Sequence, residues 1–207
     1  MASVRADKRW QPLVTKLKAT VAKAEAQLNQ PLKQELAAIY ATDQGVRAKI
    51  DSVQKNFGPK SPQWESLMKQ MSTIDEANQR RVTAIIDQYG WPGNSLVGRR
   101  GSITAFLVIQ HADLLTQQKY LPLMREATAK GELPKSSLAL LEDRVLMRMG
   151  KPQLYGSQLR SNPDTGQMEF MPIEDEAHVD ERRASVGLGP LSEYAKLFGL
   201  DYTPKKN

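Results

Sequence analysis

The chain has 207 residues, no cysteine, two histidines and a formal net charge of +6 at pH 7. The absence of cysteine excludes disulfides, thiolate metal sites and cysteine nucleophiles, and two histidines argue against a zinc site of three imidazoles. The length fits one domain that can bury a complete core. We expect a single domain over 1–207, made of an N-terminal helix in 1–34, a helical core in 35–150, a β-hairpin with short helices in 151–200, and a loose tail in 201–207.

The positive charge is spread along the chain. Short basic pairs such as Arg99-Arg100 occur, but no basic run is interleaved with aromatic residues, as a nucleic-acid site requires. We therefore expect a mildly basic solvated surface and no nucleic-acid partner. No stretch approaches the roughly 20 apolar residues of a membrane span. The opening residues lack a signal-like apolar region, and the localisation is not predicted: cytoplasmic is the expectation for the sequence as it stands, and periplasmic or secreted if a leader was removed.

Apolar residues recur at helical spacing through the first half of the chain. One stripe runs through Leu13, Leu17, Val21, Ala24 and Leu28. Pro31 suits the first turn of a second helix, which should continue to a break at 57–59. Ser61 is a plausible N-cap for the longest helix, which Gly90-Trp91-Pro92-Gly93 ends. Short breaks between these helices predict an antiparallel bundle.

The second half continues as helices and then changes character. A helix after Gly101 is apolar on nearly all faces and should be central, and helices at 116–130 and 135–149 follow. The segments 152–160 and 167–172 flank a turn-forming sequence at 162–166, which predicts a β-hairpin. Short helices should close the chain, one beginning with Glu174-Asp175-Glu176 and one at about 191–198. The fold class is therefore mainly α, a helical bundle-like domain with a small C-terminal β-hairpin.

Polar residues lie on faces of these helices that should be apolar. Asp43, Asp75 and Asn78 interrupt the stripes of the second and third helices, and a buried carboxylate is costly unless it is paired or hydrogen-bonded. Arg47 follows Asp43 by one turn, so a structural ion pair is one interpretation of Asp43. No arginine on its own helix is well placed to pair with Asp75, so Asp75 must find its partner on another element or bind a ligand.

A second polar group lies around His111, near the end of the predicted central helix. Gln110 precedes it, and Asp113, Asp143 and Arg144 also occur in segments that should be internal. A lone histidine in such a place is more often a satisfied core residue than a catalyst. However, one core rarely needs so many polar groups. An imidazole that meets a carboxylate there could carry out general acid–base chemistry near neutral pH.

Two polar groups of the C-terminal part could complete a binding site. Tyr155 and Gln158 lie in an alternating segment and offer hydroxyl and amide groups for a polar ligand; a solvent-facing hairpin is the alternative. Arg182 follows the acidic pair Glu174 and Asp175, where it could hold a carboxylate or phosphate. A solvated helix face is the alternative for that charged run.

Several short motifs together resemble one bacterial family that is catalogued only as a domain of unknown function. The resemblance covers roughly residues 35 to 195. It is carried by the motifs Asp43-Gln44-x-x-Arg47, Asp75-x-x-Asn78, Tyr89-Gly90-Trp91-Pro92, Gln110-His111-Ala112-Asp113, Asp143-Arg144-Val145, Pro152-Gln153-x-Tyr155-Gly156-x-Gln158, Pro172-Ile173-Glu174-Asp175 and Arg182-Arg183-x-x-x-Gly187-Leu188. The resemblance implies family membership but no reaction.

The leading functional hypothesis is an enzyme that modifies a small molecule or peptide by hydrolase- or lyase-type acid–base chemistry. His111 is its acid or base, and Asp75 or Asp143 orients it. Substrate-binding residues would be Arg144, Tyr155, Gln158, Gln110, Asn78, Asp43, Arg47, Arg182, Glu174 and Asp175. No cofactor or bound metal is expected. Two alternatives stay open: a non-catalytic module that binds a polar or anionic ligand, and a metal-dependent enzyme that uses His111 and the carboxylates. The oligomeric state is not predicted.

Overall fold

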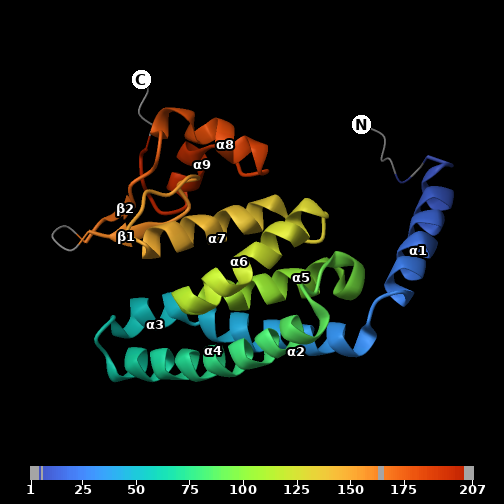
Figure 1. Cartoon of the computed structure of the whole chain (residues 1–207), viewed down its shortest axis with the longest axis horizontal. Helices are drawn as coiled ribbons and strands as arrows, with labels where there is room; N and C mark the ends of the chain where they lie inside the picture. The colour runs from blue at the N-terminus through green and yellow to red at the C-terminus, as the bar shows by residue number, and fades with distance from the viewer. Residues whose placement is uncertain (1–4, 6, 163–165, 203–207) are drawn as a thin grey trace.

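A computed structural model describes residue 5 and residues 7–162 and 166–202. It confirms a mainly α-helical fold with one small β-hairpin near the C-terminus. Figure 1 shows the helices stacked in a body from which the first helix stands apart. No helix among the described residues is long and apolar enough to cross a membrane. The elements are α1 (Trp10–Ala26), α2 (Gln30–Arg47), α3 (Ile50–Phe57), α4 (Pro62–Tyr89), α5 (Asn94–His111), α6 (Leu114–Ala129), α7 (Lys135–Arg148), β1 (Leu159–Ser161), β2 (Met168–Phe170), η2 (Glu176–His178), α8 (Val179–Ser185) and α9 (Leu191–Lys196).

The helix boundaries follow local signals in the sequence. Ser61 caps α4 by accepting a hydrogen bond from the Trp64 amide, and Gly90 ends this helix with a positive φ of 72°. The helix expected from Pro31 to residue 57 is divided into α2 and α3. Gly45 lies just before the division and weakens the last turn of α2, since glycine is a poor helix former.

The apolar α5 lies at the centre of the body, as its composition predicts. It packs against α2, α4, α6 and α7, and residues such as Ala105 and Ile109 are fully buried. Gly98 interrupts α5 with a φ of 73°. At Gly101 an added Cβ would lie 2.6 Å from a methyl of Val97, so only glycine fits this turn without displacing its neighbour. The central helix therefore fixes how the others are placed.

The expectation that the first helix joins the bundle is wrong. None of the α1 residues is buried, and Figure 1 shows α1 projecting from the body. The described contacts that hold it lie at its C-terminal end, where Glu25 pairs with Lys33 of α2 and the Asn29 amide donates to the Leu96 carbonyl over 2.8 Å. Periodicity predicts that a helix has an apolar face; it does not say what covers that face.

The C-terminal part packs beside α7 and contains the hairpin (Figure 1). Strands β1 and β2 pair antiparallel, with Leu159 opposite Phe170. The strands are shorter than predicted, and 163–165 of the expected turn lie outside the described residues. The segment before β1 is a loop instead of a strand, touching the chain after β2 by an isolated bridge between Gln153 and Ile173. This loop is held by hydrogen bonds from side chains described below.

Candidate active site

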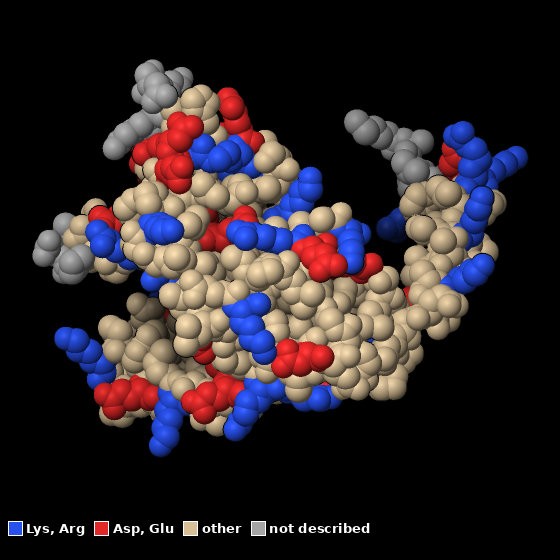
Figure 2. Space-filling view, viewed as in Figure 1, with Lys and Arg blue, Asp and Glu red and all other residues tan. Residues whose placement is uncertain are grey.

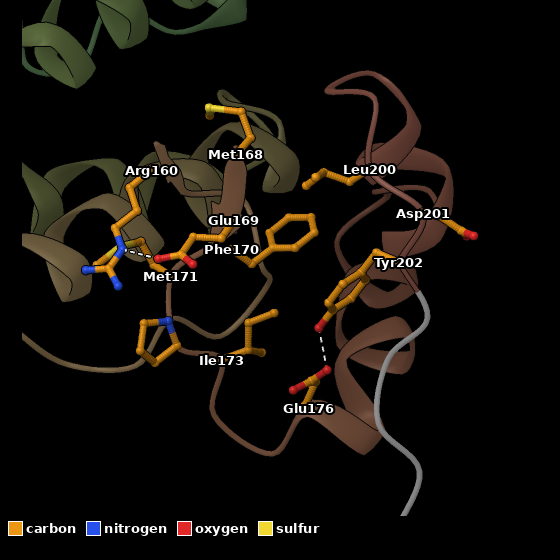
Figure 3. Close-up of a pocket in the computed structure, with 11 residues that line it drawn as sticks. Arg160, Met168, Glu169, Phe170, Met171, Ile173, Glu176, Leu200, Asp201 and Tyr202 are labelled. Carbon is orange, nitrogen blue, oxygen red and sulfur yellow. Dashed lines mark hydrogen bonds and ion pairs between the residues drawn. The ribbon is translucent and has the colours of Figure 1, made fainter. Parts of the chain in front are cut away.

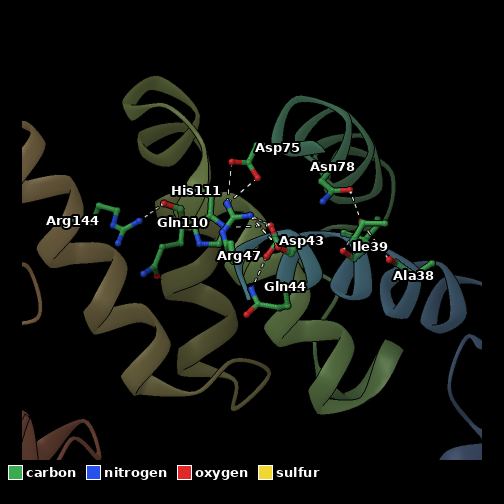
Figure 4. Close-up of polar contacts among 11 residues, drawn as sticks. Ala38, Ile39, Asp43, Gln44, Arg47, Asp75, Asn78, Gln110, His111 and Arg144 are labelled. Atoms are coloured by element: carbon green, nitrogen blue, oxygen red, sulfur yellow. Dashed lines mark hydrogen bonds and ion pairs between the residues drawn. The ribbon is translucent and has the colours of Figure 1, made fainter. Parts of the chain in front are cut away.

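Asp43 is the most deeply buried member of a polar cluster at the junction of α2, α4 and α5 (Figure 4). Its residue exposure is 1 %, and it lies on the same face of α2 as Leu36 and Ile39. The carboxylate accepts a hydrogen bond from the Gln44 side chain over 2.6 Å. A buried carboxylate must be compensated, and the cluster around Asp43 supplies that compensation entirely from side chains.

Arg47 bridges two carboxylates that come from different helices. Its Nη1 lies 3.1 Å from Asp43 Oδ1, and its Nη2 donates to both oxygens of Asp75, over 2.8 and 3.0 Å. The pairing with Asp43 one turn away was predicted, and so was a partner for Asp75 on another element. The two-pronged contact ties α2 to α4.

His111 reaches Asp43 from the end of α5. Its Nδ1 lies 3.3 Å from Asp43 Oδ1, and the side chain is 20 % exposed. The joint between α5 and α6 sets the position of the His111 side chain. Helix α5 ends at His111, and Asp113 caps α6 by accepting a hydrogen bond from the Thr116 amide over 2.8 Å. Asp113 is thus an exposed helix cap, not the internal carboxylate that we expected.

The contacts keep Asp43 ionised. Burial raises the pKa of Asp43, but hydrogen bonding and charge attraction from His111, with help from Gln44 and Arg47, outweigh it and hold the pKa below its ordinary value. An ionised Asp43 accepts a hydrogen bond from the imidazole, which favours the tautomer with the hydrogen on Nδ1 of His111 and the lone pair on Nε2. The His111 side chain is 20 % exposed, so the ring is only partly shielded from solvent.

The same atoms could also coordinate a cation. Asp43, Asp75 and His111 each offer one ligand atom, and these atoms all lie within 4.8 Å of one another. One imidazole and two carboxylates suit Mn, Fe or Mg better than a thiolate-preferring metal. Because the guanidinium of Arg47 already bridges both carboxylates, a cation would have to displace it.

Asn78 and Gln110 lie near the cluster with one polar atom unpartnered in each. The Asn78 Oδ1 is 3.5 Å from the Thr42 hydroxyl, whereas its buried Nδ2 has no hydrogen-bond partner among the described residues. Gln110 contributes its backbone carbonyl, which accepts from Arg144 and from Gln117. The side-chain oxygen of Gln110 is buried without a partner. The Asn78 amide is therefore a buried donor without an acceptor among the described residues.

The prediction that Asp143 orients His111 is wrong. Asp143 is fully buried, and its two oxygens accept hydrogen bonds from the backbone amides of Leu154, Tyr155 and Ser157, at 2.7 to 3.3 Å. All the hydrogen bonds that the Asp143 carboxylate accepts come from the loop between α7 and β1. The sequence could not distinguish this role, because a buried aspartate on an apolar face looks the same in either case.

Arg144 links this loop to the His111 joint. Its Nη1 donates to the Gln110 carbonyl over 3.0 Å, and its Nε donates to the Gln158 side chain over 3.1 Å. In Figure 4, Gln110 and His111 lie between Arg144 and the Arg47 network. Burial, followed by the repulsion of Arg148 and Arg47, lowers the pKa of Arg144. Gln158 thus lies close to the joint, with its side chain hydrogen-bonded to Arg144 and Ser157.

Tyr155 and the acidic segment do not join the cluster. Tyr155 supplies backbone groups, donating to Asp143 and accepting from Arg183. Arg182 donates to the carbonyls of Leu154, Glu174 and Asp175. The proposed anion-binding role of Arg182 is therefore replaced by a structural one, in which it holds the chain that leads into α8. Glu174 and Asp175 have exposed side chains in the same segment.

A cavity of about 460 Å³ lies beside the hairpin, on a part of the surface that we did not predict (Figure 3). The rings of Phe170 and Tyr202 meet in it with centroids 4.7 Å apart. Two of its charged residues, Arg160 and Glu169, pair with each other over 2.6 Å. None of the predicted site residues lines this cavity, and its lining lacks a histidine. It does not offer the acid–base pair found at His111.

Sequence reasoning overlooked three side chains that shape the cluster. Gln44 hydrogen-bonds Asp43, Gln117 is buried against the Gln110 carbonyl, and Arg148 donates to the Ala112 carbonyl over 2.6 Å. Gln44 lies inside a motif that had been singled out, so the motif was the available signal. Gln117 and Arg148 carry no local signal, because only the tertiary fold brings them to the joint.

The chain belongs to a protein family: residues 30–206 match the family described as "Family of unknown function (DUF6624)". The match includes every residue of the polar cluster and begins after α1. Neither a curated protein nor a solved structure matches the chain. The family description names no reaction, so the geometry of the polar cluster is the basis for proposing a function.

Proposed function

We propose that this protein is an enzyme that uses His111 for general acid–base chemistry of the hydrolase or lyase type on a small molecule or peptide. The observation that carries the proposal is the contact between the buried Asp43 carboxylate and His111 Nδ1. A carboxylate in that position fixes the ring and stabilises the imidazolium that forms when Nε2 takes a proton. Asp43 replaces Asp75 and Asp143 as the orienting carboxylate.

Other groups nearby suit the binding of a polar or anionic substrate. Arg144 uses Nε and Nη1 in its hydrogen bonds, which leaves Nη2 without a partner among the described residues. The side chain of Asp75 is 28 % exposed, so it can reach a ligand while Arg47 holds it. Arg144 of α7, Asp75 of α4 and His111 of α5 thus come from three helices, an arrangement that can position a substrate for proton transfer.

The test compares the two histidines of the chain on a panel of chromogenic esters, phosphodiesters, amides and short peptides. We expect the wild-type protein to turn over one of these classes, and His111→Gln to lose about 100-fold or more of that rate. His178→Gln is the matched control and should keep the rate, because His178 is exposed in the η2 segment. A His111→Gln protein with the wild-type rate would overturn the proposal. Ligand binding without turnover by the wild-type protein would indicate a binding module instead.

Metal-dependent catalysis is the second candidate, and the three ligand atoms within 4.8 Å favour it. Elemental analysis of protein purified without chelator separates it from the first. A stoichiometric transition metal that is lost in Asp75→Asn and His111→Gln would replace the metal-free proposal. A metal content near zero, together with activity that resists a chelator, would support the metal-free enzyme.

A further inference from the structure

Helix α1 carries an apolar stripe that nothing in the described structure covers. Leu13 and Leu17 are each 60 % exposed and Val21 is 51 % exposed. With Trp10 they recur every three or four residues, so they share one face of the helix. A monomeric protein rarely leaves such a row of large apolar side chains in water unless the row binds something.

Basic residues flank this stripe. Between Trp10 and Ala26 the helix carries Lys16, Lys18 and Lys23, with Glu25 as the sole acidic residue, and Glu25 is paired with Lys33 of α2. Figure 2 shows blue side chains around α1, away from the mixed charges of the body. At 100° per residue, Lys16 and Lys23 fall on one side of the stripe and Lys18 on the other. An apolar stripe between lysines is typical of helices that lie at the surface of a bilayer.

We propose that α1 docks on an anionic lipid surface, with its apolar stripe at the boundary of the acyl chains and its lysines at the headgroups. Positive charge beside a negative lipid surface adds to the apolar contribution. A second copy of the chain is a poorer occupant, because pairing two α1 helices brings lysines of the same sign to one seam. The helix is also only about 26 Å long, which is marginal for a helix pair.

The docked helix would hold the body at the membrane without taking part in its chemistry. The family match begins at residue 30, immediately after this helix and its linker. The linker is fixed to the body by the hydrogen bond from Asn29 to Leu96, so α1 and the body are joined by a short connection. The inference is independent of the role of His111.

The test is flotation of the full-length protein with vesicles of phosphatidylcholine containing about one third phosphatidylglycerol. We expect binding to these vesicles, and at least tenfold weaker binding to pure phosphatidylcholine. The variant Leu13→Gln/Leu17→Gln/Val21→Gln should lose binding at least tenfold, because glutamine keeps helix propensity but removes the apolar face. The control variant also introduces three glutamines, but away from α1. It is Lys55→Gln/Lys60→Gln/Lys69→Gln, which changes exposed lysines of the α3–α4 region and should bind like the wild-type protein.

Two kinds of outcome would overturn the inference. The first is a wild-type protein that ignores anionic vesicles, or an apolar triple variant that binds them as well as the wild-type protein does. The second is a concentration-dependent dimer in sedimentation without lipid that the apolar variant abolishes, since this would assign the stripe to a second copy. Because no α1 residue is buried, the variants should retain the fold, and circular dichroism checks this directly.

Discussion

Asp43 and Asp143 are two fully buried carboxylates on helices of one core, and they differ in what satisfies them. Asp143 accepts hydrogen bonds from three backbone amides of one loop. Asp43 contacts the side chains of Gln44, Arg47 and His111. Backbone donors cannot titrate or move without unfolding the loop, so Asp143 is a structural anchor.

The partners of Asp43 behave differently. Two of them are charged or titratable side chains that reach solvent, His111 at 20 % and Arg47 at 16 % exposure. A ligand or a proton can therefore change the electrostatic environment of Asp43 without unfolding a loop. Burial alone therefore does not distinguish a structural carboxylate from one whose surroundings a ligand can change. The type of hydrogen-bonding partner, backbone amide or side chain, makes that distinction.

The largest expected effect is on stability, at Asp143. Asp143→Ala would leave three backbone amides in the interior without an acceptor, at a cost of about 4 kcal/mol in the free energy of unfolding. Urea denaturation followed by circular dichroism measures this. A loss below about 1 kcal/mol would mean that water or another group replaces the carboxylate, and the anchor role would be wrong.

Asp43→Asn should have a smaller effect on stability and a larger one on activity. The amide keeps the shape and one hydrogen-bonding oxygen but removes the charge that compensates Arg47 and His111, so we expect a loss of about 2 kcal/mol. Activity, once a substrate is found, should fall by at least about tenfold. A variant with wild-type turnover would show that Asp43 is as purely structural as Asp143.

Acid should distinguish wild-type Asp43 from its amide variant. Because the folded-state pKa of Asp43 lies below the ordinary value of 3.8, its ionisation stabilises the fold above that pH, and this contribution is lost as the pH falls through the folded-state pKa. Wild-type stability should therefore decrease more steeply below pH 4 than that of Asp43→Asn, as urea melts at stepped pH would show. Parallel decreases in the two proteins would contradict the assigned direction.

The smallest effect is expected at His178, the second histidine. Hydrogen bonding and charge attraction from Asp175 raise the pKa of His178, so the stabilisation from this pair is present at acidic pH and is lost as the pH rises through the raised pKa. The pair is exposed, and exposed pairs contribute little. His178→Gln should melt like the wild-type protein at pH 8, and a clear shift in Tm there would show an unrecognised structural role.

Most of the fold could be predicted from the sequence because its signals are local. Apolar periodicity, the Ser61 cap and Gly90 locate most of the helices, although α5 begins at Asn94 instead of after Gly101 and α3 is separate from α2. The free-standing α1 could not be predicted, since its periodicity is the same whether another helix or nothing covers it. The loop before β1 alternates like a strand but is held by Asp143 and Gln153, a tertiary effect.

The site was predicted in part. Asp43, Asp75 and His111 were selected because they are polar residues in apolar stripes, and the structure brings them together. The same criterion selected Asp143 for the wrong role, because it identifies buried carboxylates without identifying their partners. The prediction for Arg182 was wrong for a related reason, since one of its backbone acceptors, the Leu154 carbonyl, comes from a segment distant in sequence.

The most direct test of the central claim is the tautomer of His111, measured by long-range ¹H–¹⁵N NMR at a pH where both imidazoles are neutral. Two histidines give two well-separated spin systems, and His178→Gln assigns them. The account predicts that His111 carries its hydrogen on Nδ1, toward Asp43, and that Asp43→Asn weakens this preference. A His111 that carries its hydrogen on Nε2 in the wild-type protein would contradict the proposed base.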